Sequence, residues 1–215
     1  MTKNLKTLLV GLPSFSVHGM ENPPVSNISE DSRKVGANGL FVAIKGRTVD
    51  GHDYILDATK QGARVIVGEL PYSKLELPSS VTYIHIKNSK KALGKIAANW
   101  FGNPSKKLRV VGVTGTKGKT TTTHLIYHIL TFAGKKAGIV SSLSAKIGEK
   151  EEDTGFHVTT PDVISLQRFL AEMVEARCEF AVLEVSSHGI DQGRVEGVDF
   201  EIGVLVNIAP EHLDY

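Results

Sequence analysis

The fold of this chain is decided by Val111-Gly-Val-Thr-Gly-Thr-Lys-Gly-Lys-Thr-Thr-Thr-Thr123. The apolar run Arg109–Val113 enters this stretch and predicts a buried strand, and apolar residues at helical spacing follow the threonines. A strand, a glycine-rich turn, Gly-Lys-Thr and a helix form the layout of a phosphate-binding loop. Glycines let the backbone approach phosphates, and a helix N-terminus offers free N–H groups and a positive dipole end. The stretch therefore predicts ATP chemistry.

The glycine spacing departs from the strict phosphate-loop pattern. That pattern places a glycine five residues before Gly118, where this chain has Val113. The alternative is a glycine-rich turn between a strand and a helix, in which Gly-Lys-Thr occurs by chance. In a phosphate loop, Lys119 would reach the β- and γ-phosphates, and the Thr120 hydroxyl would ligate Mg²⁺.

Composition indicates a globular protein. The chain has 215 residues, of which 41% are hydrophobic and 22% charged, enough for one large or two ordinary domains. A net charge of +2 gives no support for a nucleic-acid or membrane partner, and no apolar run approaches membrane-spanning length. The single cysteine, Cys178, excludes an intrachain disulfide and is expected to be a buried structural thiol. We find no signal peptide, so a cytoplasmic protein is expected.

Strands and helices are predicted to alternate, which indicates an α/β fold with two domains. In the first half we predict strands over 40–44, 64–68 and 81–86, a helix over 54–62, and a helix capped by Ser89 that runs to Trp100. The stretch 101–107 contains glycine, proline and two lysines and is interpreted as a linker. The predicted domains are residues 1–103 and residues 108–215, the second being incomplete.

In the second half we predict strands over 136–141, 180–185 and 202–208, an exposed loop over 148–154, and a helix that Pro161 opens. Continuous apolar runs of strand length are typical of a parallel sheet that is covered on both faces.

Glu184 ends the apolar run 180–184, and ligands of open α/β sheets bind beyond the carboxyl ends of the strands. Beside a phosphate loop, this carboxylate is well placed to hold Mg²⁺ directly or through water. The alternative is a strand-end glutamate that pairs with a surface lysine.

For several other polar residues, the sequence alone is consistent with either a structural or a ligand-binding role. His188 and His212 follow strands and could be structural or ligating. Thr159 and Thr160 could cap a helix or bind a phosphate or carboxylate. Arg194 could be a solvated charge or a bidentate partner for an anionic substrate. In the first half, the polar stretches 31–33 and 45–52 would by themselves be loops at strand ends.

Taken in order, seven segments of the chain resemble the Mur ligase family. They are Asp31-Ser-Arg33, Leu40-Phe-Val-Ala-Ile-Lys-Gly46, Asp50-Gly-His-Asp-Tyr54, Thr114-Gly-Thr-Lys-Gly-Lys-Thr-Thr121, Thr159-Thr-Pro-Asp162, Glu184-Val-Ser-Ser-His-Gly189 and Asn207-Ile-Ala-Pro-Glu-His-Leu-Asp-Tyr215. Within the family, the first and sixth segments favour the branch that adds the third peptide residue to UDP-N-acetylmuramoyl-L-alanyl-D-glutamate.

The resemblance implies a small N-terminal α/β domain that binds UDP, followed by the first part of a parallel-sheet, ATP-binding domain. It implies ATP and Mg²⁺ as cofactors and Lys119, Glu184 and His212 as catalytic residues. The ATP-binding residues would be Thr114, Gly115, Thr116, Lys117, Gly118, Lys119 and Thr120. The metal-binding residues would be Thr120, Glu184 and His212. Ser32, Arg47, Thr48 and Val49 would contact the UDP part of the substrate, and Thr159, Thr160, Ser186, Gln192 and Arg194 its muramoyl-peptide end.

One position departs from the family pattern: Lys117 stands where an asparagine is common, and its side chain is expected to point outward.

The chemistry that the resemblance implies is ATP-driven amide bond formation through an acyl phosphate. The partners would be the UDP-muramoyl dipeptide and an amino acid, diaminopimelate or lysine, and the protein is expected to be a monomer.

Family members have three domains, and this chain is expected to be an N-terminal fragment, inactive alone, with an open apolar sheet edge. Two alternatives remain open from the sequence: a non-catalytic module that binds a UDP-sugar or nucleotide, and a sibling ligase acting on another muramoyl peptide or a folate.

Overall fold

The computed structural model describes residues 2–46, 48–153 and 159–210. Contacts divide the chain into two units, Met1–Trp100 and Phe101–Tyr215, and each is described here by itself. Within the described ranges, no helix is both long and apolar enough to cross a lipid bilayer.

The first unit is built on a five-stranded sheet with the strand order β2-β7-β6-β5-β4. Strands β4 to β7 run parallel to one another, and β2 pairs antiparallel with β7. The strands are β2 (Phe15–His18), β4 (Ile28–Ser29), β5 (Gly39–Val42), β6 (Ala63–Gly68) and β7 (Thr82–Ile86). The three strands predicted from the sequence are therefore confirmed as β5, β6 and β7. A separate antiparallel pair joins β1 (Lys3–Asn4) to β3 (Pro24–Val25).

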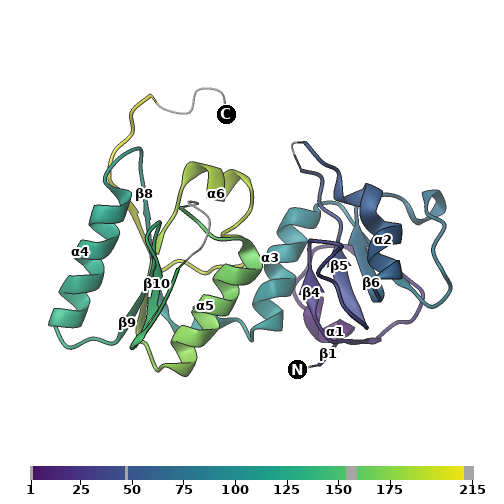
Figure 1. Cartoon of the computed structure of the whole chain (residues 1–215), viewed down its shortest axis with the longest axis horizontal. Helices are drawn as coiled ribbons and strands as arrows, with labels where there is room; N and C mark the ends of the chain where they lie inside the picture. The colour runs from purple at the N-terminus through teal and green to yellow at the C-terminus, as the bar shows by residue number, and fades with distance from the viewer. Residues whose placement is uncertain (1, 47, 154–158, 211–215) are drawn as a thin grey trace. The chain divides into compact units, whose positions relative to one another are not determined.

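Helices of the first unit connect these strands (Figure 1). They are α1 (Leu5–Leu8), η1 (Gly51–Tyr54), α2 (Ile55–Lys60), η2 (Tyr72–Lys74) and α3 (Ser89–Trp100). Ser89 was predicted to cap α3, and this is wrong in detail. Ser89 is the first helical residue, and the side-chain oxygen of Asn88 accepts from the N–H of Lys91 at 2.9 Å. The N–H and hydroxyl of Ser89 donate instead to the Glu69 carboxylate, at 2.7 and 2.8 Å.

The second unit is built on a six-stranded sheet with the order β11-β10-β9-β12-β8-β13. Strands β9, β12, β8 and β13 run parallel to one another, whereas β10 pairs antiparallel with both β9 and β11. The strands are β8 (Arg109–Thr114), β9 (Ala137–Val140), β10 (Ala145–Ile147), β11 (Lys150–Glu152), β12 (Phe180–Glu184) and β13 (Ile202–Leu205). The mixed α/β class with parallel sheets is thus confirmed.

Helices cover both faces of the central strands in the second unit (Figure 1). The helices are η3 (Pro104–Lys107), α4 (Lys119–Phe132), α5 (Val163–Glu175) and α6 (Ser187–Asp191). Val111 and Val182 belong to the core that contains Tyr127 of α4, while Val110 and Leu183 belong to the core that contains α5 side chains. Because successive strand residues point to opposite faces, these continuous apolar runs fill two cores at once.

Two predictions in this unit are corrected. The stretch 148–154 was predicted to be an exposed loop, but it contains β11, which closes a hairpin with β10 through a turn at Gly148 (φ 59°). Pro161 does not open α5, because the helix begins at Val163. The capping residue is Asp162, whose carboxylate accepts from the N–H of Ser165 at 2.9 Å, so the preceding threonines are free for another role.

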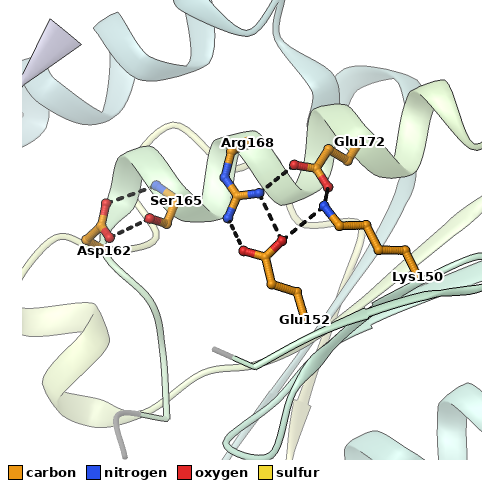
Figure 2. A network of polar contacts seen from close by, with 6 residues as sticks. All are labelled: Lys150, Glu152, Asp162, Ser165, Arg168 and Glu172. Atoms are coloured by element: carbon orange, nitrogen blue, oxygen red, sulfur yellow. Dashed lines mark hydrogen bonds and ion pairs between the residues drawn. The ribbon is translucent and has the colours of Figure 1, made fainter. Parts of the chain in front are cut away.

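A network of charges fastens the β10–β11 hairpin to α5 (Figure 2). Arg168 donates to Glu152 at 2.6 Å and also contacts Glu172, one helical turn further on. Lys150 reaches Glu152 at 3.0 Å and Glu172 at 2.8 Å. Hydrogen bonds from Arg168 and Lys150 lower the pKa of Glu152 to about 2.

Cys178 is a buried free thiol, as predicted, and burial raises its pKa. The edge strand β13 exposes apolar side chains, with Ile202 43% and Leu205 59% exposed, which agrees with the expected open edge.

Candidate functional site

The loop between β8 and α4 has a backbone shape that only glycine adopts readily. Gly115 has φ +145° and Gly118 has φ +80°. A Cβ at position 115 would lie 3.0 Å from the backbone N and O of Asn207. Gly118 is the N-cap of α4 and has no side chain to cap the helix. Because the first N–H groups of a helix have no partner within it, this terminus can hold an anion.

The Lys119 ammonium folds back over this loop. Its Nζ donates to the carbonyl oxygens of Gly115 at 2.8 Å and Thr116 at 2.9 Å. An ammonium carries three N–H donors, so a phosphate oxygen can be added to this arrangement. The loop therefore combines a cation, glycines and a helix N-terminus, which is the chemistry of a phosphate cradle.

Glu184 lies beside this loop and is 2% exposed. It ends β12, where it is opposite Val113 of β8. Its Oε1 accepts from the Thr120 hydroxyl at 2.8 Å, and its Oε2 accepts from the N–H of Ser142 at 2.8 Å. The alternative of a pair with a surface lysine is therefore wrong. These hydrogen bonds compensate the buried carboxylate, which would otherwise be costly.

The Thr120 and Glu184 oxygens fit a magnesium ion, because Mg²⁺ prefers hard oxygen ligands and commonly uses one or two carboxylates. In the described ranges, no group of three or more His, Cys, Asp or Glu side chains is arranged to hold a metal. His212, the third metal ligand expected from the family resemblance, lies outside the described residues.

The turn after β9 that supports Glu184 was not predicted from the sequence. The buried Ser141 hydroxyl accepts from the N–H of Leu143 at 3.2 Å and lies 3.1 Å from Nε2 of His124. This turn presents the Ser142 N–H to Glu184. One signal could have found it, since Ser141 and Ser142 follow an apolar strand just as Glu184 does, and the carboxyl ends of parallel strands meet at one edge.

A second cluster forms where β12 leads into α6. The Thr160 side chain is 1% exposed, and its hydroxyl accepts from the N–H of Ser186 at 3.1 Å. Arg194 donates through Nη1 to the carbonyl oxygen of Thr160 and through Nη2 to Oε1 of Gln192, both at 2.6 Å. Arg194 is therefore held in place rather than freely solvated. The structure brings together four of the residues predicted to hold the muramoyl-peptide end.

A pocket of about 610 Å³ is lined by residues of the phosphate loop and of this second cluster, but not by Thr120 or Glu184. It is lined by Thr114, Gly115, Thr116, Lys119, Thr159, Ser186, Ser187, His188, Gln192, Arg194, Leu205, Asn207, Ile208 and Ala209. Predicted ATP-binding and substrate-binding residues thus face one cavity, although they come from widely separated parts of the sequence. His188 lines it as well, and Lys117 is exposed, as expected.

The residues predicted to bind UDP are in the other unit. Ser32 is 8% exposed, and Val49 is 53% exposed with its carbonyl accepting from the N–H of Gly46 at 2.9 Å. Within the described part of the first unit, no hydrogen bond joins Ser32 to Thr48 or Val49. Arg47 lies outside the described residues.

Beside Ser32, the Asp31 carboxylate accepts from Nε of Arg33 at 2.9 Å. This side-chain hydrogen bond lowers the pKa of Asp31 to about 2. The Arg33 side chain remains 85% exposed in this pairing.

Two domain models of one family match most of this chain. Residues 24–101 match the domain described as "Mur ligase family, catalytic domain", and residues 113–215 match the "Mur ligase middle domain". UDP-N-acetylmuramoyl-L-alanyl-D-glutamate--2,6-diaminopimelate ligases of Parabacteroides distasonis and Geobacillus thermodenitrificans are 43% and 42% identical to 98% of this chain. The chain covers 43% and 42% of those relatives, about two fifths of their length.

Solved structures give the same result. A structure of a UDP-N-acetylmuramoyl-L-alanyl-D-glutamate--2,6-diaminopimelate ligase superposes with a TM-score of 0.71 at 26% identity, covering 88% of this chain and 38% of the other. A UDP-N-acetylmuramoylalanyl-D-glutamyl-2,6-diaminopimelate--D-alanyl-D-alanyl ligase from Acinetobacter baumannii has a TM-score of 0.63 at 19% identity, over 100% of this chain and 43% of the other, and supports the fold alone. The sequence matches and the shared fold together establish that this chain belongs to the Mur ligase family.

Proposed function

We propose that the second unit binds Mg²⁺ and ATP, and that it does so as part of an ATP-dependent amide ligase of peptidoglycan precursor synthesis. The observation that carries this proposal is the contact between the half-buried Thr120 and the buried Glu184, with Oγ1 and Oε1 2.8 Å apart, next to the loop that Lys119 covers. Residues 114–120 would surround the triphosphate. His212 is proposed as a further magnesium ligand.

In the proposed reaction, a carboxylate of the substrate attacks the γ-phosphorus of ATP, and ADP leaves. The amino group of the incoming amino acid then attacks the acyl phosphate and displaces phosphate, which gives the amide. Such transfers depend on positioning and on neutralising charge. Lys119 would neutralise the phosphate oxygens and the α4 N-terminus would hold them, while bound Mg²⁺ would supply further neutralisation.

The muramoyl-peptide end of the substrate is proposed to bind where Arg194 and Thr160 meet. Arg194 is fixed by two hydrogen bonds of 2.6 Å, so its guanidinium is already oriented before a ligand arrives. Fixing such a side chain in advance lowers the entropy cost of binding. Thr159, Ser186 and Gln192 would complete this part of the site.

The first unit is proposed to bind the UDP part through Ser32, Arg47, Thr48 and Val49. The names of the relatives favour UDP-N-acetylmuramoyl-L-alanyl-D-glutamate as substrate and diaminopimelate, rather than lysine, as the added amino acid. Because the chain spans about two fifths of those relatives, turnover is proposed for the whole ligase, and a role for this chain in binding alone stays open. We further propose that the protein is a cytoplasmic monomer.

Calorimetric titration of the 215-residue chain with magnesium and the β,γ-imido analogue of ATP tests the core of this proposal. Replacing Lys119 by Ala should weaken binding about tenfold or more, because a charge-assisted contact to phosphate is lost. Lys106→Ala, which removes an exposed lysine of η3, is the matched control and should bind like the wild type. Equal affinity of the wild type and Lys119→Ala would refute the assignment of this loop.

Binding of UDP-N-acetylmuramoyl-L-alanyl-D-glutamate tests the first unit independently. Ser32→Ala should weaken binding of this compound and leave binding of the ATP analogue unchanged. If Ser32→Ala binds the UDP compound as the wild type does, the UDP site lies elsewhere.

A further inference from the structure

The segment that follows β13 runs along the phosphate loop and is joined to it by several hydrogen bonds. The N–H of Val206 donates to the carbonyl oxygen of Thr114 at 2.9 Å. The N–H of Thr116 donates to the carbonyl oxygen of Asn207 at 3.2 Å. The Thr116 hydroxyl accepts from the N–H of Ala209 at 2.9 Å and donates to the carbonyl oxygen of the same residue at 3.2 Å.

One side chain in this segment binds the loop at two points. Oδ1 of Asn207 accepts from the N–H of Lys117, and Nδ2 of Asn207 donates to the carbonyl oxygen of Lys117, both at 3.0 Å. A carboxamide is suited to this task because it presents one acceptor and one donor in a single plane. The contact depends on the backbone of residue 117 and not on its side chain, which is exposed.

We propose that Asn207 is a positioning residue that holds the phosphate loop in the shape that binds nucleotide. This inference rests on the proposed function of the loop. Asn207 fixes residues 116 and 117 on the side of the loop next to β13. The N–H groups at the start of α4 then remain to hold phosphate, because they have no partner within the helix.

The backbone of the loop explains why such a support is needed. Gly115 and Gly118 flank the two residues that are hydrogen-bonded to Asn207, and both glycines have positive φ values. Glycine is the most flexible residue, so a loop that contains two of them loses much conformational entropy when it becomes ordered. Contacts that order the loop in the free protein reduce this cost at the moment of binding. Asn207 would therefore raise affinity by ordering the loop before the nucleotide binds.

Two variants test this role. Asn207→Ala removes both hydrogen bonds, and Asn207→Leu removes them while keeping a side chain of similar size. Each should weaken binding of the magnesium complex of the imido ATP analogue about tenfold, as expected for the loss of two hydrogen bonds of ordinary strength. Asn22→Ala is the control, because Asn22 accepts from the N–H of Lys6 at an exposed position in the other unit.

Amide hydrogen exchange separates positioning from general loss of stability. In both Asn207 variants, exchange at the N–H of Lys117 should become several-fold faster, while exchange in the core of β12, at Val182, should not change. A variant that is merely unstable would exchange faster at both places. Weaker binding together with faster exchange confined to the loop supports the inference.

Two results would overturn it. One is that the wild type binds the analogue and both variants bind it with an affinity within twofold of the wild-type value. The other is exchange at Lys117 that is unchanged in both variants. If the wild type does not bind the analogue, the proposed function of the loop fails, and the exchange measurement alone decides whether Asn207 holds the loop.

Discussion

Glu184 allows the stability of the second unit to be separated from magnesium binding. Its two carboxylate oxygens have one protein donor each, the Thr120 hydroxyl and the Ser142 N–H, both at 2.8 Å. Glutamine at this position can keep both contacts. Its Oε1 can accept from Ser142, and its Nε2 can donate to the hydroxyl of Thr120, because a hydroxyl accepts as well as it donates.

The expected stabilities follow from this geometry. Glu184→Ala leaves two donors without a protein partner, at about 1–3 kcal/mol for each buried group. Both donors are only half-buried, so water reaches them and we expect the lower half of that range, about 1–2 kcal/mol for each donor and about 2–4 kcal/mol in total. Glu184→Gln should change the free energy of unfolding by less than about 1 kcal/mol, because it keeps the hydrogen bonds and removes a buried charge.

The expected effect on binding is different. Both variants lose the negative charge, and a unit charge near a second charge is worth about 4 kcal/mol at 4 Å in surroundings of intermediate polarity. Even after a large discount for the solvent that enters the pocket, the magnesium-dependent affinity for the ATP analogue should fall at least ~10-fold in both variants. Urea unfolding followed by circular dichroism, and calorimetric titration at several magnesium concentrations, measure the two quantities.

Two results would refute the reasoning. If Glu184→Gln unfolds as easily as Glu184→Ala, the hydrogen bonds to Thr120 and Ser142 do not stabilise the unit in the way described. If Glu184→Gln binds the analogue with the magnesium dependence of the wild type, Glu184 does not hold the ion.

Three further predictions follow from other contacts. Gly115→Ala should lower stability by about 1–3 kcal/mol and abolish measurable binding of the ATP analogue, because φ is +145° there and the added Cβ would lie 3.0 Å from the Asn207 backbone. The stabilising contribution of Glu152, whose pKa in the folded state is about 2, should be fully present above about pH 4.5 and be lost as the pH falls towards 2. At neutral pH, Glu152→Gln should therefore have a lower thermal midpoint than the wild type, and a free energy of unfolding that is lower by no more than about 1 kcal/mol. In acid, the thermal midpoints of the two proteins should become equal. Cys178 should react slowly with a thiol reagent in the folded protein and rapidly in urea, because it is buried and its pKa is raised.

Each of these predictions can fail separately. Normal binding by Gly115→Ala would show that the loop tolerates a side chain. A constant difference between wild type and Glu152→Gln at all pH values would contradict the ion network shown in Figure 2. Rapid labelling of Cys178 in the native protein, at a rate independent of urea, would contradict its burial.

Local pattern in the sequence determined much of the fold. The apolar runs 109–113 and 180–184 predict β8 and β12 because residues that fill a core on both faces of a strand must all be apolar. The helical spacing after Ser89 predicts α3 to within one residue at its start, and the Gly-Lys-Thr stretch locates the loop before α4. The family resemblance rested on seven motif segments, among them Thr114–Thr121, and the comparisons establish the family.

The sequence was less informative where an element is short, or where several neighbouring polar residues could each begin a helix. Residues 150–152 are charged and exposed at two of three positions, and they form a strand only because β10 lies beside them. Any of Thr160, Pro161 and Asp162 could stand at a helix start. Asp162 is the residue that caps α5, whereas the Thr160 hydroxyl accepts a hydrogen bond from the N–H of Ser186. Local preferences are nearly equal in these stretches, so contacts with the rest of the unit decide.

Only the tertiary structure determined which residues form the site. Thr120 meets Glu184 across 64 positions of the sequence, and Lys117 meets Asn207 across 90. The sequence shows that each of these residues lies near a strand end, but their pairing depends on the strand order β9-β12-β8-β13 and on its register. That order depends on how side chains fill the two cores on opposite faces of the sheet. Each core is made of residues from distant parts of the sequence, so no local stretch of the chain determines the strand order.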